Sequence, residues 1–193
     1  MDLRALYDSR GQSKEIWGTA EALTRFFAPD HDVRAALARI LAILEEVKST
    51  FWLTGALALS AHGLRADLPE IEVLLSSADW DELRGELTQR GYEILGHGAR
   101  DQRNGVFIQM VTDASWLPSS PQMELLTLGR LIEMKLTSGM RGPHRMKDLT
   151  DVLELIRAAK LPRELSRELD ESVRAKYDEL WLAAASAPPD EDY

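Results

Sequence analysis

The sequence predicts an α+β fold, in which a mixed β-sheet is flanked by helices and followed by a helical C-terminal segment. Between residues 31 and 126, short apolar runs with strand alternation appear among segments with helical spacing. From residue 127 onward the spacing is helical. The 193 residues, 45% hydrophobic and 28% charged, are enough for one globular domain with a buried core and a helical appendage.

The N-terminal part predicts two helices. The first runs from Lys14 to Phe27 and is ended by Pro29, and Asp32 is expected to cap the second. In the second helix apolar residues recur at helical spacing: Val33, Leu37, Ile40, Leu41, Leu44 and Val47.

A strand, a short helix and a second strand follow. Residues 51–53 form an apolar strand, and residues 56–61 are helical in composition, with Gly63 as a C-terminal stop. The second strand alternates two acids with three apolar residues, which indicates one polar and one buried face: Glu70 and Glu72 against Ile71, Val73 and Leu75.

The next helix covers residues 79–90, is capped by Ser76 or Ser77, and ends at Gly91. The segments after it are strands at 92–95 and 106–111, the polar stretch GHGARDQRNG as a hairpin-type connection between them, and a loop with two prolines at 112–122.

The remainder predicts three helices. Thr127 caps the first, which Gly139 closes. The basic loop MRGPHRMK precedes a helix over 148–159, and Pro162 opens a last helix that runs to about Ala184. We therefore expect an N-terminal extension at 1–30, an α/β core at 31–126, a helical segment at 127–185 and a disordered acidic tail at 186–193.

Composition excludes several classes of function. The net charge of −9 argues against broad binding to nucleic acid or to an anionic membrane, although a local basic site is compatible with it. Cysteine is absent, which excludes disulfides, thiolate zinc sites and a catalytic cysteine. No apolar run approaches the roughly 20 residues that span a bilayer, and the first residues lack a signal-peptide pattern. We expect a cytoplasmic protein without membrane contact.

The first candidate site combines a glycine turn with paired acids. Glu70 and Glu72 are two apart on a strand, so both carboxylates can converge on one metal ion. The turn Thr54-Gly55-Ala56, at a helix start, offers backbone donors to phosphates. The alternative is an ordinary strand whose polar face carries two glutamates.

The second candidate site lies in the helical segment. Asp148 and Asp151 share a helix face near its N-terminus, where negative charge is favoured, and Arg145 could pair with either. Together with Lys135 they make a charged candidate site, and the alternative is a salt-bridged helix start that locks two helices together.

Two weaker candidates remain. The basic loop could contact a phosphate or an RNA end, or it could simply be solvated; its cationic or near-cationic residues are Arg141, His144, Arg145 and Lys147. Trp116, in the proline loop, could stack on a base or anchor the loop.

The run LTGALALSAHGLRADLPEIEVLL resembles the opening of the nucleotidyltransferase fold, the DNA polymerase β superfamily. That pattern is an apolar strand, Gly-Gly or Gly-Ser, a helix often ending in His-Gly, and Asp-x-Asp on the next strand. The matching positions are Gly55, His62, Gly63, Arg65, Glu70 and Glu72. The later run LGRLIEMKLTSGMRGPHRMKDLTDVLELIRAAKLP resembles the helical segment of AbiEii-type and related antitoxin-like nucleotidyltransferases. There the matching residues are Lys135, Arg145, Asp148 and Asp151.

The resemblance implies a site for a nucleoside triphosphate and Mg²⁺. Glu70 and Glu72 would hold the metal, and Lys135 would face the phosphates and act in catalysis. The remaining nucleotide-binding positions would be Thr54, Gly55, Ala56, Arg65, Gln109, Arg145, Asp148 and Asp151. A protein or RNA would be the acceptor, and a toxin–antitoxin or defence pair the setting.

The departures from the family pattern concern the chemistry itself. Ala56 replaces a serine or glycine, which removes a possible phosphate-binding hydroxyl. Both aspartates appear as glutamates, and each added C–C bond would move the metal by roughly 1.5 Å. The third acid position is Gln109, whose amide cannot act as a general base. The sequence therefore favours a protein with weak or absent transfer that binds nucleotide or a partner, and the alternative is an active Mg²⁺-dependent nucleotidyltransferase.

Overall fold

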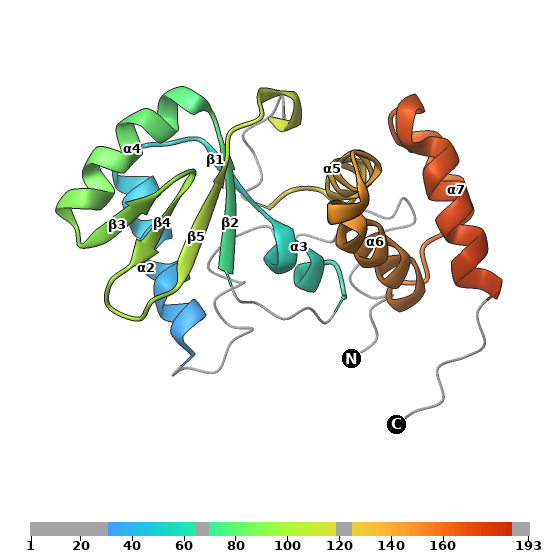
Figure 1. The fold of residues 1–193 in the computed structure, drawn as a ribbon, viewed down its shortest axis with the longest axis horizontal. Helices are drawn as coiled ribbons and strands as arrows, with labels where there is room; N and C mark the ends of the chain where they lie inside the picture. The colour runs from blue at the N-terminus through green and yellow to red at the C-terminus, as the bar shows by residue number, and fades with distance from the viewer. Residues whose placement is uncertain (1–30, 65–69, 119–124, 187–193) are drawn as a thin grey trace. The chain divides into compact units, whose positions relative to one another are not determined.

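The computed structural model describes residues 31–64, 70–118 and 125–186 (Figure 1). These residues divide into two compact units, one built around a sheet and one formed mainly by the helices from Thr127 onward. The helix expected at 14–27, the tail from residue 187 and Arg65 lie outside the described residues. None of the described helices is long and apolar enough to cross a membrane.

The sheet has five strands in the order β1-β2-β5-β4-β3. They are β1 (Phe51–Thr54), β2 (Glu70–Leu75), β3 (Tyr92–Leu95), β4 (Gly98–Asp101) and β5 (Phe107–Val111). The pair β2 and β5 is parallel and the other three pairs are antiparallel. This mixed sheet, with helices around it and helices after it, confirms the predicted α+β class.

Strand β4 corrects the prediction of a hairpin-type connection between the third and last strands, because part of that stretch is itself a strand. Its sequence, Gly-Ala-Arg-Asp, has no apolar run, so alternation gave no strand signal. Gly98 is nevertheless buried, and a Cβ there would lie 2.4 Å from Cζ of Phe107 on the neighbouring strand. The close packing of this glycine is a tertiary requirement that a single strand pattern does not show.

Three helices accompany the sheet: α2 (Asp32–Glu46), α3 (Gly55–Ala61) and α4 (Ser77–Gln89). The predicted cap of α2 was one residue off, because the Nδ1 of His31 accepts the Val33 N–H at 3.2 Å and Asp32 begins the helix. Ser76, one of the two predicted caps of α4, accepts the Asp79 N–H at 3.0 Å.

An ion pair anchors α2 to one face of the sheet. Asp101, fully buried at the end of β4, accepts a hydrogen bond from Arg39 Nε on α2 at 2.7 Å. Arg103 donates to the same carboxylate from its backbone N–H at 3.0 Å. Apolar side chains complete this buried face: Ile71, Val73, Ala99, Ile108 and Met110. The opposite face of the sheet displays the polar residues of β2 and β5.

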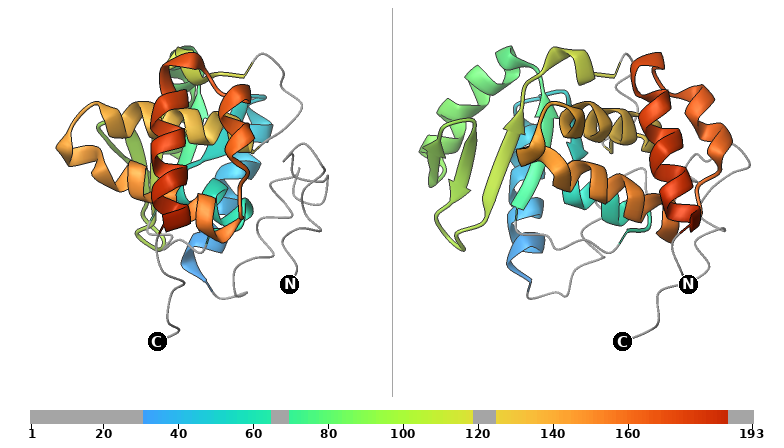
Figure 2. Two further views of the ribbon diagram at one scale, coloured as in Figure 1. Left: turned by 90° about the vertical axis from the view of Figure 1, so that its right-hand side faces the viewer. Right: turned by 45° about the vertical axis from the view of Figure 1, so that its right-hand side comes forward.

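The second unit contains α5 (Leu128–Met140), η4 (Pro143–Arg145), α6 (Met146–Ala158), η5 (Arg163–Glu168) and α7 (Glu171–Ser186). Helices α5, α6 and α7 contact one another, as the two views in Figure 2 show. Two predictions for this unit were wrong, namely the end of α5 at Gly139 and the unbroken last helix.

Both errors have a packing cause. Gly139 lies inside α5, and a Cβ there would lie 2.6 Å from Leu149 of α6, so this glycine serves close helix contact instead of termination. The last helix is interrupted at Asp170, whose backbone N–H donates to the buried Glu133 on α5 at 2.7 Å. Asp170 Oδ1 also accepts the Ser172 N–H at 2.9 Å, which starts α7 anew.

Candidate functional site

The predicted acid positions share the sheet face that carries the polar residues of β2 and β5, opposite the face with Asp101. We call it the open face. Glu72 pairs in register with Thr54 on one side and Gln109 on the other, and Glu70 pairs with Phe107. Residues opposite one another on paired strands point to the same face, so these side chains form two rows across β1, β2 and β5. Glu70, Glu72 and Gln109 are all half-buried. The structure thus brings together the three positions that the sequence placed at a metal site.

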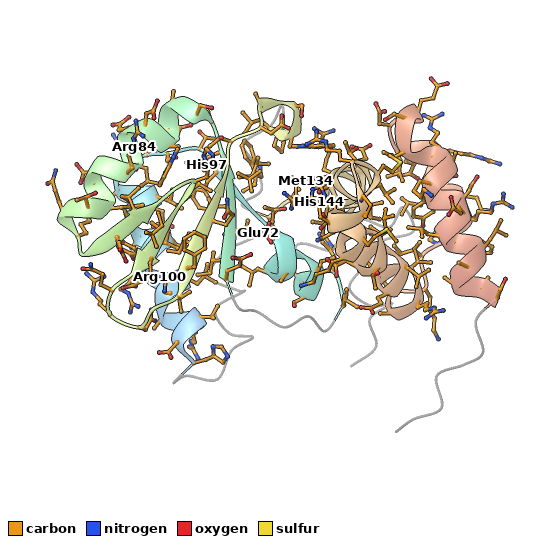
Figure 3. The ribbon with its side chains drawn as sticks, in the orientation of Figure 1. Glu72, Arg84, His97, Arg100, Met134 and His144 are labelled. Carbon is orange, nitrogen blue, oxygen red and sulfur yellow. The ribbon has the colours of Figure 1, made fainter. Side chains whose placement is uncertain are left out.

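The side chain of Glu72 lies directly against the backbone of Gly55. Gly55 has a φ of 61°, and a Cβ built there would lie 1.8 Å from Glu72 Oε1. Glycine is therefore required both by the backbone conformation and by the space that the carboxylate occupies. Figure 3 shows Glu72 beside α3, which begins at this glycine. The carboxylate of Glu72 fills the volume directly against the backbone of the turn.

Gln109 is oriented by its neighbours on β5 and before β4. Its Nε2 donates to the carbonyl oxygens of His97 at 3.4 Å and Met110 at 3.3 Å. Both bonds are longer than the roughly 2.7–3.2 Å that is usual for N–H···O hydrogen bonds. The amide has no proton-accepting group of carboxylate strength, so this position cannot deprotonate an attacking hydroxyl.

The donor set on this face suits a single magnesium ion that is shared with phosphates. Within the described ranges, no group of three or more acidic or histidine side chains is arranged to hold a metal. Two carboxylates, Glu70 and Glu72, are nevertheless adjacent on one strand face. Mg²⁺ is commonly bound by one or two carboxylates together with substrate phosphates and water. The residues present therefore fit that mode and not an all-protein metal cage.

Three residues of the second predicted set form an ion cluster between α5 and α6, in which Lys135 is buried and Asp148 and Asp151 are half-buried. Lys135 Nζ lies 3.0 Å from Asp148 Oδ1 and 2.7 Å from Asp151 Oδ2. Ser138 Oγ donates to the other oxygen of Asp148 at 2.7 Å. Burial alone would lower the pKa of Lys135, but its hydrogen bonds and charge contacts with the two aspartates outweigh burial and raise that pKa. Lys135 stays protonated and holds the two helices together.

Arg145 does not join this cluster. It is exposed, and in the described part of the chain it forms no ion pair with Asp148 or Asp151, which Lys135 engages instead. His144 and Lys147 of the basic loop are exposed as well. Trp116 is half-buried in η3 (Ala114–Trp116).

Sequence reasoning missed two residues on the open face. Phe107 is half-buried, two positions before Gln109, and Arg100 pairs with it in register from β4. Strand alternation alone places Phe107 on the face of Gln109. Arg100 could not be found this way, because β4 was not predicted as a strand.

The sheet order, the glycine turn at the end of β1 and the paired acids on β2 agree with the nucleotidyltransferase-like fold that the sequence resemblance implies. The solved structure of the antibiotic-resistance factor ANT(2'')-Ia superposes on this chain with a TM-score of 0.53 at 13% sequence identity. The match covers 79% of this chain and 97% of that chain. At this identity the likeness shows the fold alone. The chain matches no model of a known protein family, and no curated protein matches its sequence.

Proposed function

We propose that this chain is a nucleotidyltransferase-like protein that binds nucleotide on the open face of its sheet and transfers it weakly or not at all. The observation that supports the proposal is the set of side chains at the three acid positions. Glu70, Glu72 and Gln109 occupy one face, with two long carboxylates and one neutral amide. A fold built for transfer is retained, while the groups that perform transfer are altered.

Each altered group affects a different step. Mg²⁺ requires near-ideal octahedral geometry, so the extra methylene of each glutamate moves the ion away from the position that two aspartates would give. Glu72, against Gly55, fills space beside the phosphate turn. Gln109 leaves the acceptor hydroxyl without a base. When bound, Mg²⁺ would neutralise phosphate charge at Glu70 and Glu72.

The remaining residues have proposed roles in binding. The backbone of Thr54, Gly55 and Ala56 would face the phosphates, with Arg65 as a further cation. In the helical unit, Lys135, Asp148 and Asp151 would act as a preformed ion cluster, and Arg145 would supply an exposed guanidinium to an anion. A pairing with a partner in a toxin–antitoxin or defence system rests on the sequence resemblance of this unit.

An active Mg²⁺-dependent nucleotidyltransferase is the second candidate. The observation in its favour is that Glu70 and Glu72 remain adjacent carboxylates on the face next to the glycine turn. A protein or RNA hydroxyl would be the acceptor, and because Gln109 supplies no general base, the proton of that hydroxyl would have to pass to solvent.

Transfer assays separate the two candidates. The protein is incubated with each labelled nucleoside triphosphate and Mg²⁺ or Mn²⁺, in the presence of total RNA and cell lysate. The proposal expects little or no label transfer by the natural chain. It expects a gain of at least tenfold in the triple variant Glu70→Asp/Glu72→Asp/Gln109→Asp, since one general base typically contributes about 10²–10⁴-fold.

The control is the double variant Glu70→Ala/Glu72→Ala, which keeps neither carboxylate. Strong transfer by the natural chain that this variant abolishes would establish the active enzyme instead. Binding is measured separately by calorimetry with ATP and Mg²⁺. No heat and no thermal stabilisation at millimolar ATP would remove nucleotide from the proposal.

A further inference from the structure

The ring of Phe107 lies across a glycine on the open face of the sheet. A Cβ at Gly98 would be 2.4 Å from Cζ and 3.0 Å from Cε1 of Phe107, so the ring covers the β4 backbone. Gly98 is buried, whereas Phe107 itself is only half-buried. One side of the ring therefore packs on β4 and part of its surface stays accessible.

The cationic side chain of Arg100 belongs to the residue directly opposite Phe107 on β4. Arg100 pairs in register with Phe107 and is exposed. Within the described ranges its guanidinium forms no ion pair, and Figure 3 shows it on the part of the sheet away from Glu72 and α3. A planar guanidinium next to an aromatic ring suits a planar ligand that carries hydrogen-bond acceptors.

The distance from the glycine turn to this ring fits a nucleotide. Gly55 follows β1 and the ring covers β4, and the two strands are separated by β2 and β5. At about 4.8 Å per strand, three steps give about 14 Å. An extended nucleoside triphosphate has a comparable span, and Glu70, Glu72 and Gln109 would lie between its two ends.

We propose that Phe107 is the stacking platform for the nucleobase, with Arg100 at the edge of that base. The inference rests on the proposed nucleotide site and names the part of it that binds the base. It assigns base stacking to Phe107, whereas the sequence left Trp116 either to stack on a base or to anchor its loop.

A purely structural role for the ring makes a different prediction. In the structural role, the ring only fills the space above Gly98, where glycine has no side chain. Phe107→Leu keeps that cover but removes the π-face, and Phe107→Trp enlarges the π-face. If the ring stacks on the base, nucleotide affinity should fall in Phe107→Leu and be kept or rise in Phe107→Trp. A filling role predicts no such order.

The test compares ATP with inorganic tripolyphosphate, which has the phosphates but no base. Calorimetry with Mg²⁺ is run on the natural chain, Phe107→Leu, Phe107→Trp and Trp116→Leu. We expect Phe107→Leu to weaken ATP binding about tenfold, consistent with the loss of one base stack, with tripolyphosphate affinity unchanged. Phe107→Trp is expected to bind ATP at least as tightly as the natural chain, and Trp116→Leu to match it.

The results that would contradict the proposal distinguish a failure of the nucleotide site from a failure of the stacking platform. If the natural chain binds neither ligand, the proposed nucleotide site fails and the platform with it. If it binds ATP and Phe107→Leu binds ATP equally well, the platform alone is overturned. Equal weakening of both ligands by Phe107→Leu would also overturn it, because the effect would then be structural. Thermal unfolding checks that each variant is folded, and if Phe107→Leu is not, Phe107→Trp and Phe107→Tyr decide by the same comparison.

Discussion

At the end of β1, the positive φ of Gly55 and the carboxylate of Glu72 impose the same residue for two separate reasons. The first is local, since a φ of 61° is unfavourable for residues with a Cβ. The second is tertiary, since the nearest oxygen of Glu72 lies 1.8 Å from where that Cβ would be. Asp101 is a second residue with a demanding environment, because its buried charge is paired with two arginines.

Gly55→Ala is expected to destabilise the protein by about 1–3 kcal/mol, because it introduces both backbone strain and a clash. The measurement is urea unfolding followed by circular dichroism. Gly85→Ala on α4 is the matched control, because nothing lies within 4 Å of its added Cβ. That control should gain about 0.5–1 kcal/mol from helix propensity; equal effects at the two glycines would contradict the contact with Glu72.

Asp101→Asn is expected to cost about 1.5–3 kcal/mol at neutral pH, because the buried carboxylate is lost as the charged acceptor of hydrogen bonds from the half-buried Arg39 and from Arg103. Burial would raise the pKa of Asp101, but hydrogen bonds from Arg103 and Arg39 outweigh burial and lower it below its ordinary 3.8. A lowered pKa means that the stabilisation is complete above pH 3.8 and is lost as the pH falls through the folded-state value.

The stability difference between Asp101→Asn and the natural chain should therefore shrink in acid. Urea unfolding across the acid range measures it. Asp81→Asn is the control, because its ion pair with Arg84 is exposed and should contribute within about 0.5 kcal/mol. A difference that stays constant down to the lowest pH would show that the Asp101 charge is not the cause.

At the scale of elements, helix pairs in this protein are joined by close glycine contact and by buried charge. Gly139 lets α6 approach α5, and Lys135 on α5 binds two carboxylates of α6. Glu133, also on α5, fixes the break before α7 through the Asp170 N–H. One helix thus organises the unit through three different kinds of contact.

Lys135→Met is expected to destabilise the protein by about 3–5 kcal/mol, because it leaves Asp148 and Asp151 without their cation. Adding Asp148→Asn and Asp151→Asn should recover part of this loss. Because the pKa of Lys135 is raised, its stabilisation is complete below pH 10.5 and is lost as the pH rises through the higher folded-state value. Chemical unfolding at neutral and strongly alkaline pH measures both effects.

The same exchange at another lysine serves as the control for Lys135. Lys176→Met removes an ion pair with the exposed Glu179 within α7 and should change stability by less than about 0.5 kcal/mol. If Lys135→Met is as mild as Lys176→Met, the cluster is not a stabilising clamp, and a direct role toward an anion becomes the better account of Lys135.

At the scale of the whole molecule, charge limits the choice of partner. A net charge of −9 repels polyanions, while the basic residues of the loop between α5 and α6 are confined to a few positions. A similar fold occurs in ANT(2'')-Ia at 13% identity, so the fold forms although most positions carry different side chains.

The natural chain is expected to show no general affinity for RNA. Filter binding with random-sequence RNA at physiological salt should give a dissociation constant weaker than roughly 10⁻⁴ M, the weak end of non-specific binding. The matched comparison is the variant Arg145→Glu/Lys147→Glu, which should behave alike. Tight, salt-dependent retention of the natural chain that this variant loses would identify the loop as an RNA site.

The sequence by itself determined the strand and helix periodicities, the glycine turn and the polar face with Glu70 and Glu72, because each is a local pattern of two to four residues. Only the tertiary structure decided what depends on residues distant in the chain. Strand β4 pairs with β3 and β5 although its own sequence has no strand pattern. Gly139 lies inside α5, where it packs against Leu149. Lys135, and not Arg145, which is nearer in the sequence, forms the ion pairs with Asp148 and Asp151. Those outcomes follow from pairwise distance and burial, which spacing along a chain does not encode.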